Sequence, residues 1–333
     1  MEKIKFGIVG TGTIAHRFAE AIKNVPEAEL VAVASRKEET GKAFAEEFGI
    51  PHVIVTYEAM AASPLIDAAY IGLPHSYHCP VSCMMMRGGK HVLCEKPLAV
   101  TRREAEQMFA TAKENRVFLM EAMWGRLVPG TQKLLSLVNE GVLGEILGVE
   151  GKFCYQMDED EMGHHVFKNE NGGGSLLDVG VYGLSFAKWY LGTDIISTAA
   201  QANIVNNTDY HTCVQLAYAN GAIAQLSSAT MLRKPNEGFV YGTKGYAKIN
   251  RFYAPQTIEL HPNDGPVQTI ETPYWGNGFE EQIAHTCRCI AEGLTESPVI
   301  TPEHSLFIMG QMDAIRKEIG LTYLQDNDEG NAQ

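Results

Sequence analysis

The sequence predicts an α/β protein in which a doubly wound parallel sheet is followed by an α+β domain built on a large, mostly antiparallel sheet. A length of 333 residues suits about two domains. Up to residue 123, short apolar runs alternate with helical patterns, as in parallel sheets with crossover helices. Beyond residue 124, strand-like runs follow one another across short polar turns such as Asn220-Gly221. We therefore expect domains at 1–123 and 124–333.

Composition excludes several classes of protein. The formal net charge of −13 argues against a nucleic-acid partner, because binding to phosphates needs a basic surface. No apolar run is long enough to cross a bilayer, and the first residues lead directly into a strand without a signal-peptide pattern. Seven scattered cysteines fit reduced thiols better than a disulfide framework. We expect a cytoplasmic protein.

In chain order, the first half alternates β-branched apolar runs with amphipathic segments. These predict strands at 4–9, 29–34, 67–73, 91–94 and 117–122, and helices after residue 12 and at 37–48, 57–62, 80–87 and 102–115. The second half predicts helices at 130–140, 279–292 and 301–320, and strands at 146–155, 194–202, 212–218, 222–231, 238–241, 245–250 and 257–260. We expect the helix at 301–320 to pack back on the first domain.

The first strand runs into a glycine-rich turn, Gly10-Thr11-Gly12-Thr13-Ile14-Ala15. This G-x-G-x-x-A pattern lies between a strand and a helix, where Gly10 makes a tight turn and Gly12 lets the backbone approach a pyrophosphate at the helix N-terminus. The alternative is a tight turn in an α/β protein that binds no dinucleotide. The context favours the cofactor site.

The second predicted strand is followed by Ser35-Arg36-Lys37, where NAD-binding folds usually carry an acidic residue for the ribose 2′-hydroxyl. A hydroxyl and two cations suit a 2′-phosphate instead, since a guanidinium pairs with phosphate through two hydrogen bonds. The sequence therefore predicts NADP, with NAD possible. The alternative is a solvated pair, Arg36 and Lys37, that faces Glu38 and Glu39.

The buried strand at 91–94 is followed by Glu95-Lys96-Pro97. Proline has no N–H for a sheet, so the strand must stop here and leave an acid and a base at its carboxyl end. In open α/β sheets, ligands bind at that edge.

These motifs, together with Pro74…His78, Glu121–Arg126, Gly172–Tyr182 and Gly278-Phe279-Glu280, resemble the glucose-fructose oxidoreductase / inositol dehydrogenase (Gfo/Idh/MocA) family. The glycine run that ends in Tyr182 looks most like the dihydrodiol dehydrogenase and NADP-dependent sugar dehydrogenase branch. Many relatives carry histidine in place of Tyr182, and often asparagine in place of His75.

The resemblance implies an N-terminal Rossmann domain and a C-terminal domain for substrate binding, whose open-faced sheet assembles a homodimer or homotetramer. It implies an NADP-dependent dehydrogenase of a sugar, polyol or cyclic trans-diol. The Lys96-Pro97 bond is often cis in the family. The implied cofactor-binding residues are Gly10, Thr11, Gly12, Thr13, Ile14, Ser35, Arg36, Lys37, Leu73, Pro74, His75, His78, Glu95 and Lys96.

The expected proton relay consists of Lys96, Tyr182 and Asp178. Tyrosine has a pKa of about 10, and a nearby ammonium lowers it, so Lys96 would make Tyr182 a usable base. We expect Ser175 to open a helix on which Asp178 and Tyr182, four residues apart, share one face. Asp178 would bond a substrate hydroxyl or fix Lys96. The alternatives are a capping box between Ser175 and Asp178 and a core phenol at Tyr182.

Trp124 could pack on a sugar ring or an arene and Arg126 could bond hydroxyls, although packing at the domain interface explains them equally well. His164 and His165, with the acidic run 158–161, lack metal-ligand spacing, so we expect no metal. A nicotinamide-binding sensor without turnover is the alternative function. Such a regulator would not need Lys96, Asp178 and Tyr182.

Overall fold

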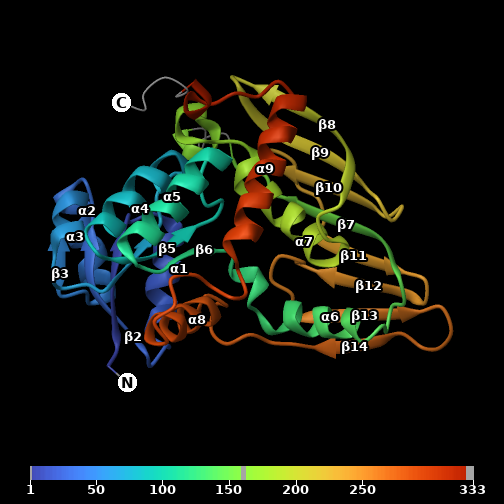
Figure 1. Cartoon of the computed structure of the whole chain (residues 1–333), viewed down its shortest axis with the longest axis horizontal. Helices are drawn as coiled ribbons and strands as arrows, with labels where there is room; N and C mark the ends of the chain where they lie inside the picture. The colour runs from blue at the N-terminus through green and yellow to red at the C-terminus, as the bar shows by residue number, and fades with distance from the viewer. Residues whose placement is uncertain (1, 159–162, 328–333) are drawn as a thin grey trace. The chain divides into compact units, whose positions relative to one another are not determined.

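The computed structural model describes residues 2–158 and 163–327, which fall into two compact units (Figure 1). One unit extends to Trp124 and includes Trp275–Leu306, and the other contains Gly125–Tyr274 and the residues from Phe307 on. The segment 275–306 thus belongs to the first unit. The division into domains at 1–123 and 124–333 stays a prediction, as does the packing of the last helix on the first domain.

The first unit contains a six-stranded sheet in which all paired strands are parallel. Its order is β3-β2-β1-β4-β5-β6, in which the direction of strand addition reverses between β1 and β4. The strands are β1 (Ile4–Val9), β2 (Ala28–Ala34), β3 (His52–Ile54), β4 (Ala68–Ile71), β5 (His91–Glu95) and β6 (Leu119–Ala122). The predicted doubly wound sheet is confirmed.

Helices join these strands because apolar residues recur at helical spacing between them. Thr56 and Thr101 cap α3 and α5 through their side-chain oxygens, and Gly49 ends α2 in the left-handed region at φ 70°. The helices of this unit are α1 (Thr13–Ile22), α2 (Glu38–Phe48), α3 (Tyr57–Ala62), α4 (His78–Arg87), α5 (Arg102–Asn115) and α8 (Glu280–Ala291).

The second unit contains an eight-stranded sheet of order β14-β13-β12-β11-β7-β10-β9-β8, antiparallel except where β10 pairs with β7. Its strands are β7 (Ile146–Cys154), β8 (Ile195–Val205), β9 (Thr208–Tyr218), β10 (Ile223–Ala229), β11 (Glu237–Gly242), β12 (Gly245–Asn250), β13 (Thr257–Pro262) and β14 (Gln268–Glu271). Its helices are α6 (Pro129–Asn139), α7 (Val181–Leu191) and α9 (Pro302–Glu318), whose first turn belongs to the first unit. The mostly antiparallel sheet is confirmed.

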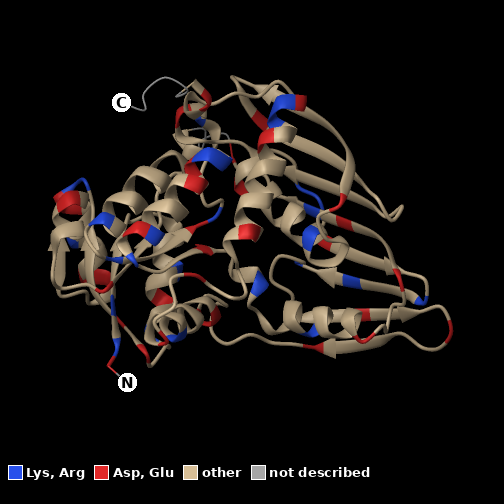
Figure 2. Ribbon diagram, viewed as in Figure 1, with Lys and Arg blue, Asp and Glu red and all other residues tan. Residues whose placement is uncertain are grey.

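This sheet buries one face only. Val240, Ala247, Ile249 and Ile258 are fully buried, while the residues between them along the strands are partly exposed. α7 packs against β7 and β10 on the buried side (Figure 1). Figure 2 shows basic and acidic residues interspersed along the ribbon of both units.

The structure adds details that the sequence patterns did not predict. The edge strands β3 and β14 were not expected, because short edge strands lack a clear apolar alternation. Residues Leu176–Gly180, expected as the first turns of a helix, form a π turn that precedes α7. The other expected strands and helices are confirmed, with boundaries shifted by a few residues.

A buried glutamate, Glu121 on β6, ties together three parts of the first unit. It is 2% exposed, its Oε1 accepts the Leu98 N–H (3.0 Å), and its Oε2 accepts the Ser305 hydroxyl (2.5 Å). Burial raises the pKa of Glu121 to about 6, against the opposing effect of these two hydrogen bonds. Residue 98, two positions after Lys96, is therefore fixed to β6 and to the start of α9.

We expect the free energy of unfolding to change with pH as the Glu121 carboxyl titrates. Because the pKa of Glu121 in the folded protein lies above its ordinary value of 4.5, protonation favours folding, and that contribution is lost as the pH rises through 6. Relative to Glu121→Gln, the wild-type free energy of unfolding should therefore fall by about 1 kcal/mol between about pH 5 and about pH 8. Urea unfolding of both proteins across this range measures it.

The control is Glu106→Gln, at an exposed glutamate of α5 that pairs with Arg102. It should show no comparable change with pH. A difference between wild type and Glu121→Gln that is constant across the range would contradict the assignment.

Candidate active site

The glycine-rich turn lies at the reversal point of the parallel sheet, where β1 and β4 are neighbours. Gly10 has φ +106°, and a Cβ there would lie 2.5 Å from the Gly72 carbonyl oxygen that follows β4. Gly12 precedes α1 as an extended N-cap, and a Cβ on it would meet no atom within 4 Å. The first turn of α1 thus begins beside open space, the geometry that admits a pyrophosphate.

The segment that follows β2, residues 35–37, is held by the Ser35 hydroxyl and by the ring of Tyr77. Ser35 Oγ lies 2.7 Å from Thr40 Oγ1 and accepts the Lys37 N–H (3.3 Å). The Arg36 guanidinium lies over the Tyr77 ring, 5.3 Å from its centroid, and Nη1 donates to the phenol oxygen (3.4 Å). The stacked arginine is exposed and keeps donors that can bind a phosphate.

Arg36 and Lys37 are both exposed, as the alternative of a solvated pair also expects. Glu38 pairs with Lys42, one turn further along α2, at 2.7 Å. That pair is exposed and typical of a helix surface.

His78, predicted to bind the cofactor, is fully buried at the start of α4. Its Nδ1 lies 2.8 Å from the Pro97 carbonyl oxygen and its Nε2 lies 2.8 Å from that of Leu73. Burial lowers the pKa of His78 to about 4, helped by Lys96, so the ring is neutral and donates to one of the two carbonyls. We infer that His78 joins the loops that follow β4 and β5. The nearby His75 is also buried, with the ring centroids 5.5 Å apart.

Glu95 ends β5 inside the sheet and is 4% exposed. Its Oε1 accepts the Tyr70 hydroxyl (2.5 Å), and its Oε2 accepts the N–H of Lys96 (3.3 Å). Burial raises the pKa of Glu95, while Lys96 and Tyr70 oppose the rise. The Lys96-Pro97 bond is cis, as the resemblance implied, and the Lys96 side chain is half-buried.

In the second unit, the alternative of a capping box between Ser175 and Asp178 is not observed. The Ser175 hydroxyl donates to Asp209 Oδ2 (2.7 Å) and makes no capping bond, and the backbone of Ser175 is already helical instead of extended as at a usual N-cap. Asp178, within that turn, accepts the Tyr155 hydroxyl on Oδ2 (2.6 Å). Its carboxylate is therefore oriented by a phenol from the end of β7.

Tyr182, the second residue of α7, is 6% exposed and lies in an aromatic cluster. Its ring centroid lies 5.4 Å from that of Phe153 and 5.7 Å from that of Tyr253. Phe153 and Tyr253 stack on each other at 3.9 Å, with an interplanar angle of 8°. The core packing of the Tyr182 ring is compatible with the predicted catalytic role, because packing would fix the ring while the hydroxyl would carry the chemistry.

Trp124 and Arg126, two of the four predicted substrate residues, fall in different units. Trp124 is 3% exposed and packs on Phe279 (centroids 5.1 Å apart), with the Arg17 guanidinium 5.1 Å from its ring. Arg126 lies 5.9 Å from the Trp189 ring. Its Nη1 is buried with no hydrogen-bond partner among the described residues, and burial lowers its pKa.

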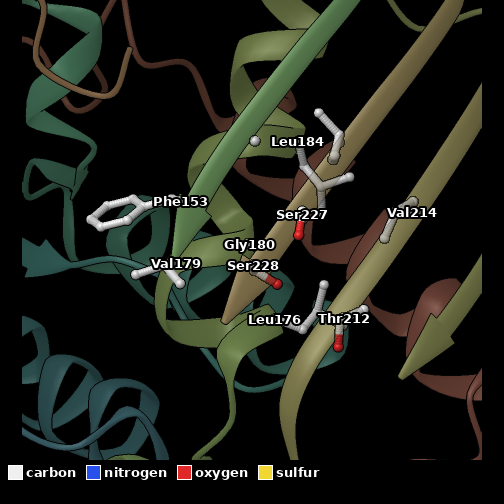
Figure 3. Close-up of a pocket in the computed structure, with 11 residues that line it drawn as sticks. Phe153, Leu176, Val179, Gly180, Leu184, Thr212, Val214, Ser227 and Ser228 are labelled. Atoms are coloured by element: carbon white, nitrogen blue, oxygen red, sulfur yellow. The ribbon is translucent and has the colours of Figure 1, made fainter. Parts of the chain in front are cut away.

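A small cavity lies under the π turn (Figure 3). Its lining comes from the π turn, α7, β7, β9 and β10 and includes Phe153, Leu176, Thr212, Leu226 and Ser228. The lining is apolar apart from hydroxyl groups. We therefore assign the cavity to the packing of the turn and not to substrate binding.

Sequence analysis included Glu121 in a motif without giving it a role, and it did not single out Tyr155 or Asp209. Each of the three bonds a candidate residue, or a residue two positions from one, from a distant place in the chain. Within residues 2–158 and 163–327, no cluster of His, Cys, Asp and Glu is arranged to hold a metal ion. Most of the acidic run before His164 lies outside the described residues. The helices that the structure describes are all too short or too polar to span a membrane.

Two family models match the chain. The model described as "Oxidoreductase family, NAD-binding Rossmann fold" matches residues 4–123, and the "GFO/IDH/MocA C-terminal domain" matches residues 131–248.

Individual relatives cover nearly the full length. The chain is 31% identical to trans-1,2-dihydrobenzene-1,2-diol dehydrogenase of Mus musculus, over 97% of this chain and 99% of the relative, and 29% identical to that of Homo sapiens, with the same coverage. Among solved structures, a 3-ketoreductase from Actinomadura kijaniata in complex with NADP and TDP-benzene has a TM-score of 0.88 at 28% identity, over 96% of this chain and 98% of that one. An aldose-aldose oxidoreductase from Caulobacter crescentus complexed with glycerol has a TM-score of 0.86 at 26% identity, over 95% and 97%.

Both halves of the chain thus match one family, and the turn after β1 has the geometry that its dinucleotide-binding domain requires. The protein is an NAD(P)-dependent oxidoreductase and belongs to the Gfo/Idh/MocA family.

Proposed function

We propose that this protein uses NADP to transfer a hydride to or from a hydroxyl or carbonyl carbon of a sugar, polyol or cyclic trans-diol. The observation that carries the proposal is the position of Lys96. It follows β5 at the carboxyl edge of the parallel sheet, where open α/β sheets bind their ligands. The substrate class is supported by relatives named as a dihydrodiol dehydrogenase and an aldose-aldose oxidoreductase.

The residues present fit NADP. Gly10 and Gly12 leave room for a pyrophosphate at the N-terminus of α1. Ser35, Arg36 and Lys37 would hold the 2′-phosphate, and Leu73, Pro74, His75 and Glu95 would border the nicotinamide end. The solved 3-ketoreductase with NADP supports this choice.

When bound, the nicotinamide accepts or supplies the hydride. In the oxidative direction, Tyr182 takes the proton of the substrate hydroxyl while hydride leaves the same carbon, which becomes a carbonyl. The Lys96 ammonium favours the phenolate of Tyr182 and so makes the phenol a usable base near neutral pH. Asp178, oriented by Tyr155, bonds a second substrate hydroxyl. In the reductive direction Tyr182 returns the proton.

We expect Lys96→Met and Tyr182→Phe each to lower turnover by a factor of about 100 or more, typical of the loss of a general acid–base group. The measurement is reduced-cofactor absorbance on a panel of sugars, polyols and cyclic diols. Cofactor affinity, measured by quenching of protein fluorescence, should be retained in both variants.

Matched controls are Lys113→Met, at an exposed lysine of α5, and Tyr218→Phe, at a buried tyrosine of β9. Both should turn over as the wild type does. Near-normal turnover in either test variant removes that residue from the mechanism. Tight NADP binding by a wild type that turns over no substrate of the panel would favour the sensor instead.

Cofactor choice is tested at Arg36. Because a charged hydrogen bond contributes about 1.5–3 kcal/mol, Arg36→Ala should raise the KM for NADP by about 10- to 100-fold and leave the KM for NAD nearly unchanged. Arg102→Ala, at an exposed arginine of α5, should change neither constant. A wild type that prefers NAD would overturn the proposal.

We also propose a homodimer or homotetramer assembled through the partly exposed face of the second sheet. Aromatic rings gather on that face across three adjacent strands. The Phe239 and Tyr241 rings of β11 lie 5.7 Å apart, and the Tyr246 ring of β12 stacks on His261 of β13 at 4.4 Å. Aromatic residues in a sheet face without a helix layer suit an interface between proteins.

Tyr246→Arg should therefore shift the molar mass of the protein in solution from the oligomer toward the monomer, since a charge would be buried in the interface. Light scattering after size exclusion measures this mass. Leu65→Arg, at an exposed leucine of the first unit, is the control and should leave the mass unchanged. A wild type that is monomeric at micromolar concentration would refute the proposed assembly.

A further inference from the structure

Asp209 on β9 is a fully buried carboxylate that the mechanism above does not use. Its Oδ2 accepts three hydrogen bonds, from the Ser175 hydroxyl (2.7 Å), the Leu176 N–H (2.8 Å) and the Thr212 hydroxyl (2.6 Å). Two of these donors belong to the residues that begin the π turn. Asp209 therefore fixes the start of that turn to the sheet.

The other oxygen of Asp209 is packed against the glycine run. A Cβ on Gly174 would lie 2.0 Å from Oδ1, and Oδ1 has no hydrogen-bond partner among the described residues. Gly174 has φ +117°, so a side chain there would be strained as well as blocked. The Tyr323 hydroxyl, which would lie 3.2 Å from the same Cβ, donates to the Gly173 carbonyl. The glycine run thus contacts both β9 and the C-terminal segment.

The π turn carries Asp178 and leads directly into α7, whose second residue is Tyr182. The Asp178 N–H bonds the Gly174 carbonyl (3.1 Å), so a displacement of residue 174 moves the backbone of Asp178 with it. We propose that Asp209 is a positioning residue, which sets the places of Asp178 and Tyr182 for substrate binding and proton transfer. This inference rests on the proposed function.

Packing alone does not account for a carboxylate at this position. A buried charge with one oxygen unbonded lowers stability, and burial raises the pKa of Asp209 to about 6. An apolar residue would fill the space without that cost. Three directional hydrogen bonds from one oxygen define the path of the turn, which an apolar residue cannot do.

The test compares Asp209→Ala, which removes the acceptor, with Asp209→Asn, which keeps one acceptor oxygen. We expect the alanine variant to lose about 10- to 100-fold in kcat, because a displacement of about 1 Å at reacting groups has that effect. The asparagine variant should recover most of the loss. NADP affinity, a property of the first unit, should stay unchanged in both.

A second pair of variants keeps the inference testable if Asp209→Ala does not fold. Gly174→Ala places a methyl group against Oδ1, whereas Gly192→Ala carries similar strain (φ +79°) with no atom within 4 Å. The first should lower kcat as Asp209→Ala does, and the second should not. Equal kcat in the two glycine variants, or unchanged kcat in Asp209→Ala, would overturn the positioning role.

Hydrogen exchange separates failure of this inference from failure of the proposed function. Amide protection in a peptide covering residues 174–182 should drop in Asp209→Ala and persist in Asp209→Asn, whether or not a substrate has been found. A wild type without turnover would refute the proposed function alone. Protection that is unchanged in Asp209→Ala would refute the positioning role alone.

Discussion

Two buried carboxylates accept hydrogen bonds from main-chain N–H groups, and the two segments that carry Lys96 and Asp178 depend on these bonds. A carboxylate buried away from water needs hydrogen-bond donors from the protein, and the groups that donate to it are thereby fixed in place. Glu121 takes the N–H of Leu98, two residues after Lys96, and Asp209 takes the N–H of Leu176, two residues before Asp178. Each also accepts a serine hydroxyl, from Ser305 and Ser175 respectively. In each unit a strand residue therefore determines the course of the segment that carries a proposed catalytic residue.

Gly10 and Gly174 are both needed because the backbone at each position lies very close to a neighbouring group. At Gly10, a side chain would strike the carbonyl of Gly72, and at Gly174 it would strike the Asp209 carboxylate. Both residues also have positive φ. At each position, both the lack of space for a side chain and the positive φ require glycine. Gly10 lies beside the proposed dinucleotide site, and Gly174 precedes the turn that carries Asp178.

Local patterns were sufficient for the architecture and for the residues within motifs. Strand–helix alternation predicts the parallel sheet, and G-x-G-x-x-A predicts the turn after β1, because each depends on neighbours in sequence. The supporting residues are different. Asp209 lies 33 positions from Leu176, and Ser305 lies 184 positions from Glu121, so no spacing rule connects them. The π turn was missed because the apolar pattern of residues 176–191 continues without a break into α7.

The proposed catalytic residues and the aromatic residues beside Tyr182 are held in place by different kinds of contact. Lys96 lies two residues before Leu98, and Asp178 lies two residues after Leu176. The N–H groups of both leucines are fixed by buried hydrogen bonds, which tolerate little change. Phe153 and Tyr253, which stack beside Tyr182, are held by ring contacts, and such contacts admit other side chains of similar size. A family with this division can keep one hydride and proton transfer while its members accept dihydrodiols, aldoses or other hydroxyl compounds. If the proposed roles hold, substrate range should vary with the aromatic residues around Tyr182, and the rate of proton transfer should depend on the buried carboxylates that hold the two segments.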